Sequence, residues 1–268
     1  MRVIIDGEAV DAAQATISVF DWALFRGLGA FEVVRSEAGV PRHLDAHLDR
    51  LERSLSALLL GDLDRAPLAD AVNAVAAEND DGLIRMMVTA GGRDPEVIAP
   101  SHTIIVWEPM PALPDTLSLL PMRSPWHPAT NQAGFAGVKW LSYAPNMASI
   151  DVAVAAGYHD ALLTTMDDVV LELPTSSVAW VSDGSLFTPS LDLGILLSIT
   201  REVTLECARQ EGVPVIEGTF GLDELLGADE VMALSTGKRV LAVGRVGEVE
   251  FPSGPVTARL AAAYDAQP

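Results

Sequence analysis

The six prolines between residues 109 and 128 constrain the fold of this 268-residue chain more than any other feature. Proline fixes φ and has no N–H to donate, so this stretch predicts neither a long helix nor a central strand. A chain of this length forms one large domain or two modest ones. We therefore expect a smaller N-terminal α/β domain over residues 1–112, a proline-rich linker over 113–128 and a larger C-terminal domain over 129–268.

Hydrophobic periodicity predicts helices and strands on both sides of the linker. The clearest helix begins at Leu44, because Leu44, Leu48, Leu51, Leu55 and Leu58 recur at steps of four and three and share one face. Further helices are expected over residues 67–79 and 196–211. Strands are expected over residues 3–5, 30–35, 40–44, 83–89, 102–107, 160–165, 168–172, 178–181, 213–216, 230–235 and 240–243.

Charge and composition exclude several classes of protein. The chain has 37 acidic and 17 basic residues, a net charge of -20, which argues against nucleic-acid binding because phosphate contacts need clustered Lys and Arg. A single cysteine, Cys207, excludes an internal disulfide and multi-cysteine metal sites, and its apolar helical setting predicts burial. No apolar run is long enough for a membrane span, and the N-terminus does not read as a signal peptide. We expect a cytoplasmic protein without a membrane partner.

Lysine is scarce, and this restricts where lysine chemistry can occur. Only Lys139 and Lys238 are present, and Lys139 lies in the apolar and aromatic segment GVKWLSYAPN. A desolvated lysine is a competent Schiff-base nucleophile. A lysine at a sheet edge with its ammonium in solvent fits the same pattern, and residue type alone does not choose between the two. Lys238 follows a turn and is expected to be exposed.

Four other patterns have a functional and a simpler interpretation. Glu172 ends an apolar run and is either a functional carboxylate or a solvated turn residue. Residues 194–201 open a helix and could bind phosphate, or carry an ordinary Ser or Thr cap. Residues 235–237 form a hydroxyl and amide cluster or merely a turn. His43 and His47 are expected to be surface histidines, because no third metal ligand accompanies them, and we expect no metal site.

Taken in order, six segments between about residues 17 and 245 resemble the class IV aminotransferase family, the fold type IV pyridoxal-phosphate enzymes. The resemblance implies an α/β (α+β) fold of two domains with the cofactor in the cleft between them. The family includes branched-chain aminotransferases, D-amino acid transaminases and aminodeoxychorismate lyases. The segments are ISVFDWALFRGLGAFEVVR, HLDAHLDRLERS, VKWLSYAPNMA, DVVLELPTSSVAWVSDG, LGILLSITR and ADEVMALSTGKRV.

This resemblance also implies roles for individual residues. Lys139 matches the lysine that forms the Schiff base with pyridoxal 5'-phosphate and then moves the substrate proton, and Glu172 matches the carboxylate facing the pyridine nitrogen. The remaining matches are cofactor contacts from Arg50, Tyr143, Ile199, Thr200 and Thr236, and substrate contacts from Phe31, Arg85, Arg26 and Gly237.

The implied activity is amino transfer between an amino acid and a 2-oxo acid. An alternative on the same fold is aminodeoxychorismate lyase, which releases pyruvate and 4-aminobenzoate. A third alternative, a binding protein that keeps the fold without catalysis, would not need Lys139. The resemblance further implies a homodimer in which the loop around residues 25–31 reaches into the partner's site.

Overall fold

The chain divides into two compact units, which are described one at a time. The first comprises Met1–Pro111 and Val138–Tyr143, and the second comprises Ala112–Gly137 and Ala144–Gln267. Each unit is built on its own β-sheet, which confirms the α/β fold class. The computed structural model describes residues 2–94, 96, 99–127 and 135–267, so Pro128 and the first residues of the expected C-terminal domain lie outside the described part.

The first unit differs from the domain that the sequence predicts, because the segment Val138–Tyr143 belongs to it. Trp140 bridges Ala30 in antiparallel fashion, and the Leu141 amide donates to the Gly29 carbonyl at 2.9 Å. The segment thus continues the hydrogen bonding of the strand that contains Ala30. Lys139 therefore belongs to the N-terminal unit.

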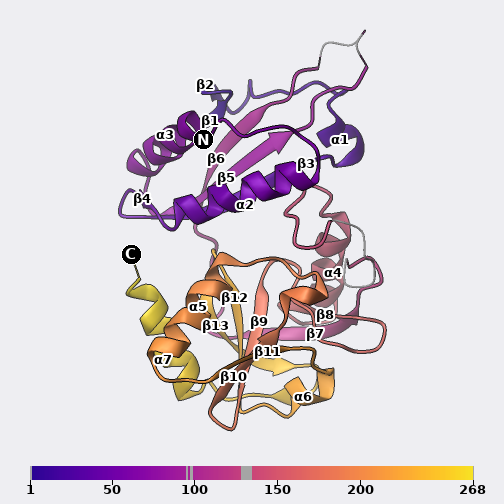
Figure 1. The fold of residues 1–268 in the computed structure, drawn as a ribbon, viewed down its shortest axis with the longest axis vertical. Helices are drawn as coiled ribbons and strands as arrows, with labels where there is room; N and C mark the ends of the chain where they lie inside the picture. Colours follow the sequence, from indigo (N-terminus) through magenta and orange to yellow (C-terminus); the bar gives the residue numbers. More distant parts are fainter. Residues whose placement is uncertain (1, 95, 97–98, 128–134, 268) are drawn as a thin grey trace. The chain divides into compact units, whose positions relative to one another are not determined.

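A six-stranded antiparallel sheet forms the centre of the first unit, in the order β2-β1-β6-β5-β3-β4 (Figure 1). Most strands lie close to the predicted ranges. Strands β1 and β2 form a hairpin with Asp6 and Gly7 in its turn. One short helix after residue 21 was not predicted. The elements are β1 (Arg2–Ile5), β2 (Glu8–Asp11), α1 (Trp22–Arg26), β3 (Gly29–Glu37), β4 (Val40–Pro41), α2 (Leu44–Ala57), α3 (Arg65–Ala77), β5 (Gly82–Thr89) and β6 (Thr103–Pro109).

Helices α2 and α3 bury their apolar faces against this sheet. Leu48, Leu51 and Leu55 of α2 are almost fully buried, as the four-three spacing predicts. They join Val72 of α3 and Ile84 of β5 in one hydrophobic core. Burial of each leucine side chain contributes about 2 kcal/mol of transfer free energy, so this face fixes where α2 lies on the sheet.

The second unit contains an eight-stranded mixed sheet in the order β11-β10-β9-β12-β13-β7-β8, with β14 paired to β13. Strand β7 lies in the stretch that we expected to be a linker. Pro121 is tolerated there because β13 pairs with β7 only up to Leu119, so the missing N–H lies where the strand has a single neighbour. The strands are β7 (Leu117–Arg123), β8 (Asp160–Thr164), β9 (Ser177–Ser182), β10 (Ser185–Pro189), β11 (Val215–Gly218), β12 (Glu230–Ser235), β13 (Arg239–Val246) and β14 (Val249–Glu250).

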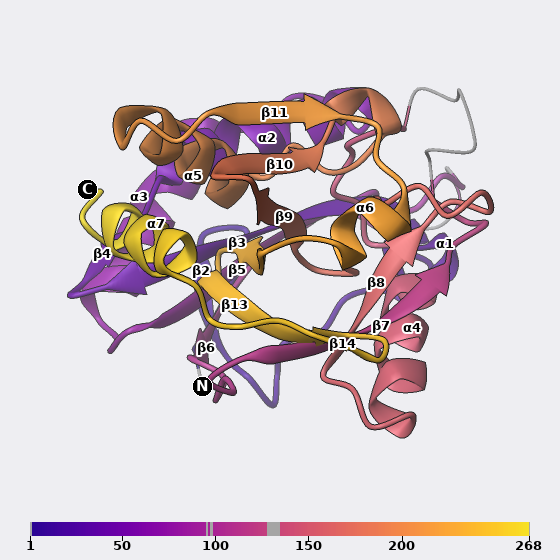
Figure 2. The same ribbon diagram turned by 90° about the horizontal axis from the view of Figure 1, so that it is seen from below.

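Helices cover both faces of this sheet. Figure 2 shows strands of the sheet around α6, and Trp180, Leu225 and Val231 belong to the core between them. Helices α5 and α7 share a separate core with side chains of the sheet, among them Met232. Cys207 is buried in this core, as expected. No helix in the described part is long and apolar enough to cross a membrane. The helices are α4 (Ala144–Ala155), the 3-10 turn η2 (Leu191–Leu193), α5 (Ile199–Gln210), α6 (Leu222–Leu226) and α7 (Pro255–Asp265).

Candidate active site

Lys139 is held in the first unit by its own backbone. Its carbonyl accepts the Phe31 amide at 3.0 Å, and its amide donates to Ser54 Oγ at 3.1 Å. The side chain is buried, with Nζ 4.3 Å from the centroid of the Phe31 ring and 5.6 Å from that of Tyr143. The two rings meet edge to face at 5.3 Å. The side-chain amine of Lys139 therefore lies close to two aromatic rings.

A buried ionic cluster lies on β3 and α2, close to this amine. Glu32 is fully buried and accepts two hydrogen bonds from Arg50, Nε to Oε1 at 2.6 Å and Nη2 to Oε2 at 2.7 Å. His47 Nδ1 contacts Oε2 at 2.8 Å. The expectation that His47 is a surface residue is wrong, because α2 turns this position towards the sheet. The sequence analysis assigned no role to Glu32, whose partners lie 15 and 18 residues away.

The pKa values of this cluster fix its charges. Burial alone raises the pKa of Glu32, but the charge and hydrogen bonds of Arg50, with a smaller contribution from His47, lower it to about 2. Burial lowers the pKa of His47, so the imidazole is neutral at pH 7 and donates Nδ1–H to the carboxylate. The Glu32 carboxylate therefore holds the Arg50 guanidinium in one orientation.

The other predicted residues of the first unit differ in how they are engaged. The Arg85 guanidinium lies over the Phe31 ring, 5.8 Å from its centroid, and donates to both carboxylate oxygens of Glu108 at 3.0 and 3.1 Å. Arg26 is exposed on α1, where it stacks on Phe25 and donates to that residue's carbonyl. Phe31, Arg50, Arg85, Lys139 and Tyr143 thus share one unit, and Arg26 lies on its surface.

Glu172 lies in the second unit with both carboxylate oxygens occupied. Oε1 contacts His127 Nε2 at 3.1 Å, and Oε2 accepts the Leu196 amide at 3.2 Å. The expected strand over 168–172 forms only isolated bridges, at Val169 and Val170, because a turn after Thr164 brings the chain back against β8. Glu172 is therefore an oriented carboxylate and not a solvated turn residue.

Helix α5 begins at Ile199, and its first turn has amides available for an anion. Ser198 caps the helix, since its Oγ accepts the Arg201 amide at 3.2 Å. The amides of Ile199 and Thr200 donate no hydrogen bond to any residue that the structure describes. Unpaired N–H groups at the positive end of a helix dipole form a site for phosphate. The helix starts three residues later than the sequence predicts, because Ser198 has an extended backbone and acts as the N-cap.

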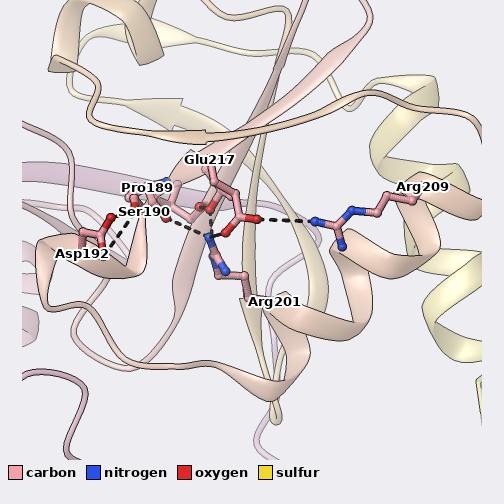
Figure 3. A network of polar contacts seen from close by, with 8 residues as sticks. Pro189, Ser190, Asp192, Arg201, Arg209 and Glu217 are labelled. Atoms are coloured by element: carbon pink, nitrogen blue, oxygen red, sulfur yellow. Dashed lines mark hydrogen bonds and ion pairs between the residues drawn. The ribbon is translucent and has the colours of Figure 1, made fainter.

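The buried Arg201 fixes this helix end to the sheet. Figure 3 shows its side chain extending from α5 towards Glu217, which also meets Arg209. Arg201 Nη2 donates to Glu217 Oε2 at 2.6 Å and to the Pro189 carbonyl at 2.9 Å, and Nε donates to Thr188 Oγ1 at 3.2 Å. One guanidinium therefore joins α5 to β10 and β11. The sequence singled out only the two residues before it.

Lys238 is not the exposed lysine that the sequence predicts. Its Nζ donates to Ser176 Oγ at 2.9 Å and Thr175 Oγ1 at 3.2 Å, and it lies 3.4 Å from Asp160 Oδ2. Only 16% of the Lys238 side chain and 5% of that of Asp160 are exposed. Burial raises the pKa of Asp160, and the charge of Lys238 opposes that rise. The fold of the second unit therefore commits Lys238 to a structural ion pair.

The turn between β12 and β13 carries Thr236 and Gly237, next to this lysine. Both residues are half-buried, and Thr236 makes no hydrogen bond within the described part of the chain. The second unit thus contributes an oriented carboxylate, a helix end with two available amides and a turn with an available hydroxyl. Among the described residues, no group of three His, Cys, Asp or Glu side chains could hold a metal ion.

These groups suit pyridoxal phosphate in their chemistry. A buried primary amine can condense with its aldehyde, an ionised carboxylate can accept the N–H of its pyridine ring, and helix amides with an arginine can bind its phosphate. The amides of Ile199 and Thr200 support this fit, because they donate to no described residue and can donate to a phosphate.

Comparison with known proteins places the chain among such enzymes. The sequence model of the family "Amino-transferase class IV" matches residues 29–246. A Methanocaldococcus jannaschii protein assigned as a branched-chain-amino-acid aminotransferase is 31% identical over 254 residues, covering 91% of this chain and 87% of the relative. The aminodeoxychorismate lyase of Bacillus subtilis is 27% identical over 278 residues, covering 98% and 93%.

Solved structures agree with this assignment. A hypothetical aminotransferase from Mycobacterium tuberculosis, determined in its PLP-bound form, superimposes with a TM-score of 0.91 at 25% identity. The match covers 99% of this chain and 98% of that one. The chain therefore belongs to the class IV aminotransferase family, the pyridoxal-phosphate-dependent enzymes of fold type IV.

Proposed function

We propose that the protein is an aminotransferase that moves an amino group between an amino acid and a 2-oxo acid. The observation that carries the proposal is the setting of Lys139, whose Nζ lies between the rings of Phe31 and Tyr143. The chain has one other lysine, and that one is committed to Asp160 and two hydroxyls. Lys139 is thus the side-chain amine that the cofactor would use.

Residues matched by the family resemblance would bind the cofactor phosphate or ring in this proposal. Arg50, oriented by Glu32, binds the phosphate as a fixed cation. The amides of Ile199 and Thr200 bind the same group, and Thr236 adds a hydroxyl donor. Tyr143, whose ring lies beside Lys139, would contact the cofactor, and Glu172 would accept the hydrogen bond of its ring nitrogen.

Two residues carry the chemistry. When bound, pyridoxal phosphate supplies an aldehyde that condenses with amines and a ring that accepts electrons from the substrate Cα. Lys139 Nζ would act as the base that takes the proton from the substrate Cα and then as the acid that gives it up at C4′. The Glu172 carboxylate keeps the ring nitrogen protonated by accepting its N–H, and this strengthens the ring as an electron acceptor.

Substrate contacts come from Phe31, Arg85, Arg26 and Gly237 in this proposal. A substrate carboxylate would share Arg85 with Glu108, which already binds Nε and Nη2 of the guanidinium. Arg26 reaches a substrate only from the surface of α1, where Phe25 is 54% exposed. A homodimer, in which the loop around residues 25–31 serves the partner's site, would give these exposed groups a function.

Aminodeoxychorismate lyase is the second candidate, favoured by the Bacillus subtilis relative that matches almost the whole chain. The two activities differ in their products. An aminotransferase incubated with an amino donor converts the visible band of the bound cofactor to the pyridoxamine band and yields a 2-oxo acid. A lyase instead releases pyruvate and 4-aminobenzoate from aminodeoxychorismate.

The scarcity of lysine makes a direct test of the cofactor site possible. Borohydride reduction of the protein with pyridoxal phosphate, followed by peptide mass mapping, should place the reduced cofactor on Lys139. Lys238→Arg should keep the label and Lys139→Ala should lose it. Label on Lys238, or no uptake of the cofactor at all, would overturn the proposal. A panel of amino donors, read through the cofactor spectrum, then separates aminotransferase from lyase.

A further inference from the structure

The carboxylate of Glu172 has a buried partner that neither the sequence nor the proposed roles account for. His127 is 4% exposed, and its Nε2 lies 3.1 Å from Glu172 Oε1, 45 residues away in sequence. The imidazole contacts one carboxylate oxygen and a backbone amide donates to the other, so both oxygens of Glu172 are held by buried or backbone groups. The arrangement lies entirely within the second unit.

Both members of the pair are attached to the same strand end. The Glu172 carbonyl accepts the Leu163 amide at 2.8 Å. The Thr164 carbonyl, next along β8, accepts Ser124 Oγ at 2.8 Å and the Ser124 amide at 2.9 Å. The His127 amide in turn donates to the Ser124 carbonyl at 3.0 Å. Two neighbouring residues of β8 therefore set the separation of imidazole and carboxylate.

The hydrogen-bonding capacity of the carboxylate shows what this arrangement can do. An ionised carboxylate has two oxygens with about four acceptor positions and no donor. His127 Nε2–H and the Leu196 amide occupy one position on each oxygen and leave the others open. Two fixed donors, one on each oxygen, stop the carboxylate from rotating.

We propose that His127 is a positioning residue that holds Glu172 ready to accept the ring N–H of the cofactor. This inference rests on the proposed function, because it takes Glu172 as the partner of the ring nitrogen. His127 does not touch the cofactor. It acts through Glu172, by fixing the orientation of the carboxylate.

The test uses the holoenzyme reconstituted with pyridoxal phosphate labelled with ¹⁵N in the ring. His127→Leu removes the donor and should move the ring nitrogen signal towards the unprotonated position, with kcat lowered about 10-fold or more and KM nearly unchanged. His127→Gln keeps an N–H donor of similar reach and should restore most of the signal and of kcat. A positioning role requires this rescue, whereas a merely structural histidine would not produce the change in the nitrogen signal.

A second variant and a matched control complete the design. His127→Asn is polar but too short to reach Glu172, and it should behave as His127→Leu does even if the leucine variant fails to fold. His159, an exposed histidine of the same unit that accepts the Ser118 amide at 2.9 Å, is the control, and His159→Gln should change neither readout. An unchanged nitrogen signal and kcat in His127→Asn would overturn the inference. Failure of the wild-type protein to bind the cofactor would overturn the proposed function instead.

Discussion

The charge of Glu32 should stabilise the protein at neutral pH and lose this effect in acid. The pKa of this carboxyl falls from its ordinary value of 4.5 to about 2 in the folded protein. At about 1.4 kcal/mol per pH unit, that difference contributes about 3 kcal/mol to the free energy of unfolding at pH 7. Because the folded-state pKa is the lower one, the contribution is complete above pH 5 and disappears as the pH falls through 4.5 towards 2.

Glu32→Gln should therefore lower the free energy of unfolding at pH 7 by about 3 kcal/mol or more, since it also leaves the buried Arg50 without a charge partner. Urea unfolding of the apoprotein, followed by tryptophan fluorescence, measures this loss. The part of the wild-type advantage that comes from ionisation should shrink to about 1 kcal/mol at pH 3. The double variant Glu32→Gln with Arg50→Met removes both charges and should recover part of the stability.

Two results would refute this reasoning. One is a Glu32→Gln protein as stable as the wild type at pH 7, with the same dependence on pH between 7 and 3. The other is a double variant less stable than Glu32→Gln alone, which would mean that the Arg50 charge is not left unpaired by the single substitution. His47→Gln is the control, because it changes a neutral partner of the same carboxylate and should cost only about 1 kcal/mol.

Three further predictions concern other parts of the chain. Lys238→Met should destabilise the protein by about 3 kcal/mol at pH 7 and by less at pH 4, because the buried Asp160 loses its cation and its raised pKa makes the charged form costly as the pH rises. Urea unfolding at the two pH values measures this, and equal losses at both would contradict the prediction. Ser198→Ala should cost about 1 kcal/mol and Ser198→Thr much less, measured by thermal unfolding, and equal melting temperatures would show that the cap on α5 contributes nothing. Leu51→Ala should cost about 3–4 kcal/mol in urea unfolding, since this side chain is fully buried in the first core, and a loss below about 1 kcal/mol would show that the core closes over the cavity.

Much of the fold could be predicted because its elements carry local signals. Helix α2 has a strict leucine spacing, and most strands are short β-branched runs between turns. Helix α4 was missed because its apolar residues surround the axis, and Val152 and Val154 are exposed while Ala153 is buried. Helix α7 was missed because alanine makes up much of it and leaves no periodic contrast. Strand β7 was missed because proline content masks a strand that pairs on one side.

The candidate site could be predicted only where a motif is continuous in sequence. Lys139, Glu172 and the start of α5 each lie in a segment that is recognisable by itself. Glu32 and His127 were missed because their partners are distant in sequence. Arg50 lies 18 residues from Glu32, and Glu172 lies 45 residues from His127. No spacing rule applies over such separations. A glutamate in the middle of an apolar strand was the one available signal for Glu32, because such a charge is buried only with a partner.

The first unit is discontinuous in sequence, and this decides when it can finish folding during synthesis. Residues 1–111 leave the ribosome as a chain that lacks the segment Val138–Tyr143, so the Gly29 carbonyl, the Phe31 amide and the Ser54 hydroxyl wait for partners that are translated later. An N-terminal fragment ending at Pro111 would expose an incomplete strand edge, a surface prone to pairing with other chains. The first unit is complete only when the segment that contains Lys139 has emerged from the ribosome. The N-terminal unit can therefore finish folding only together with the segment that supplies its lysine.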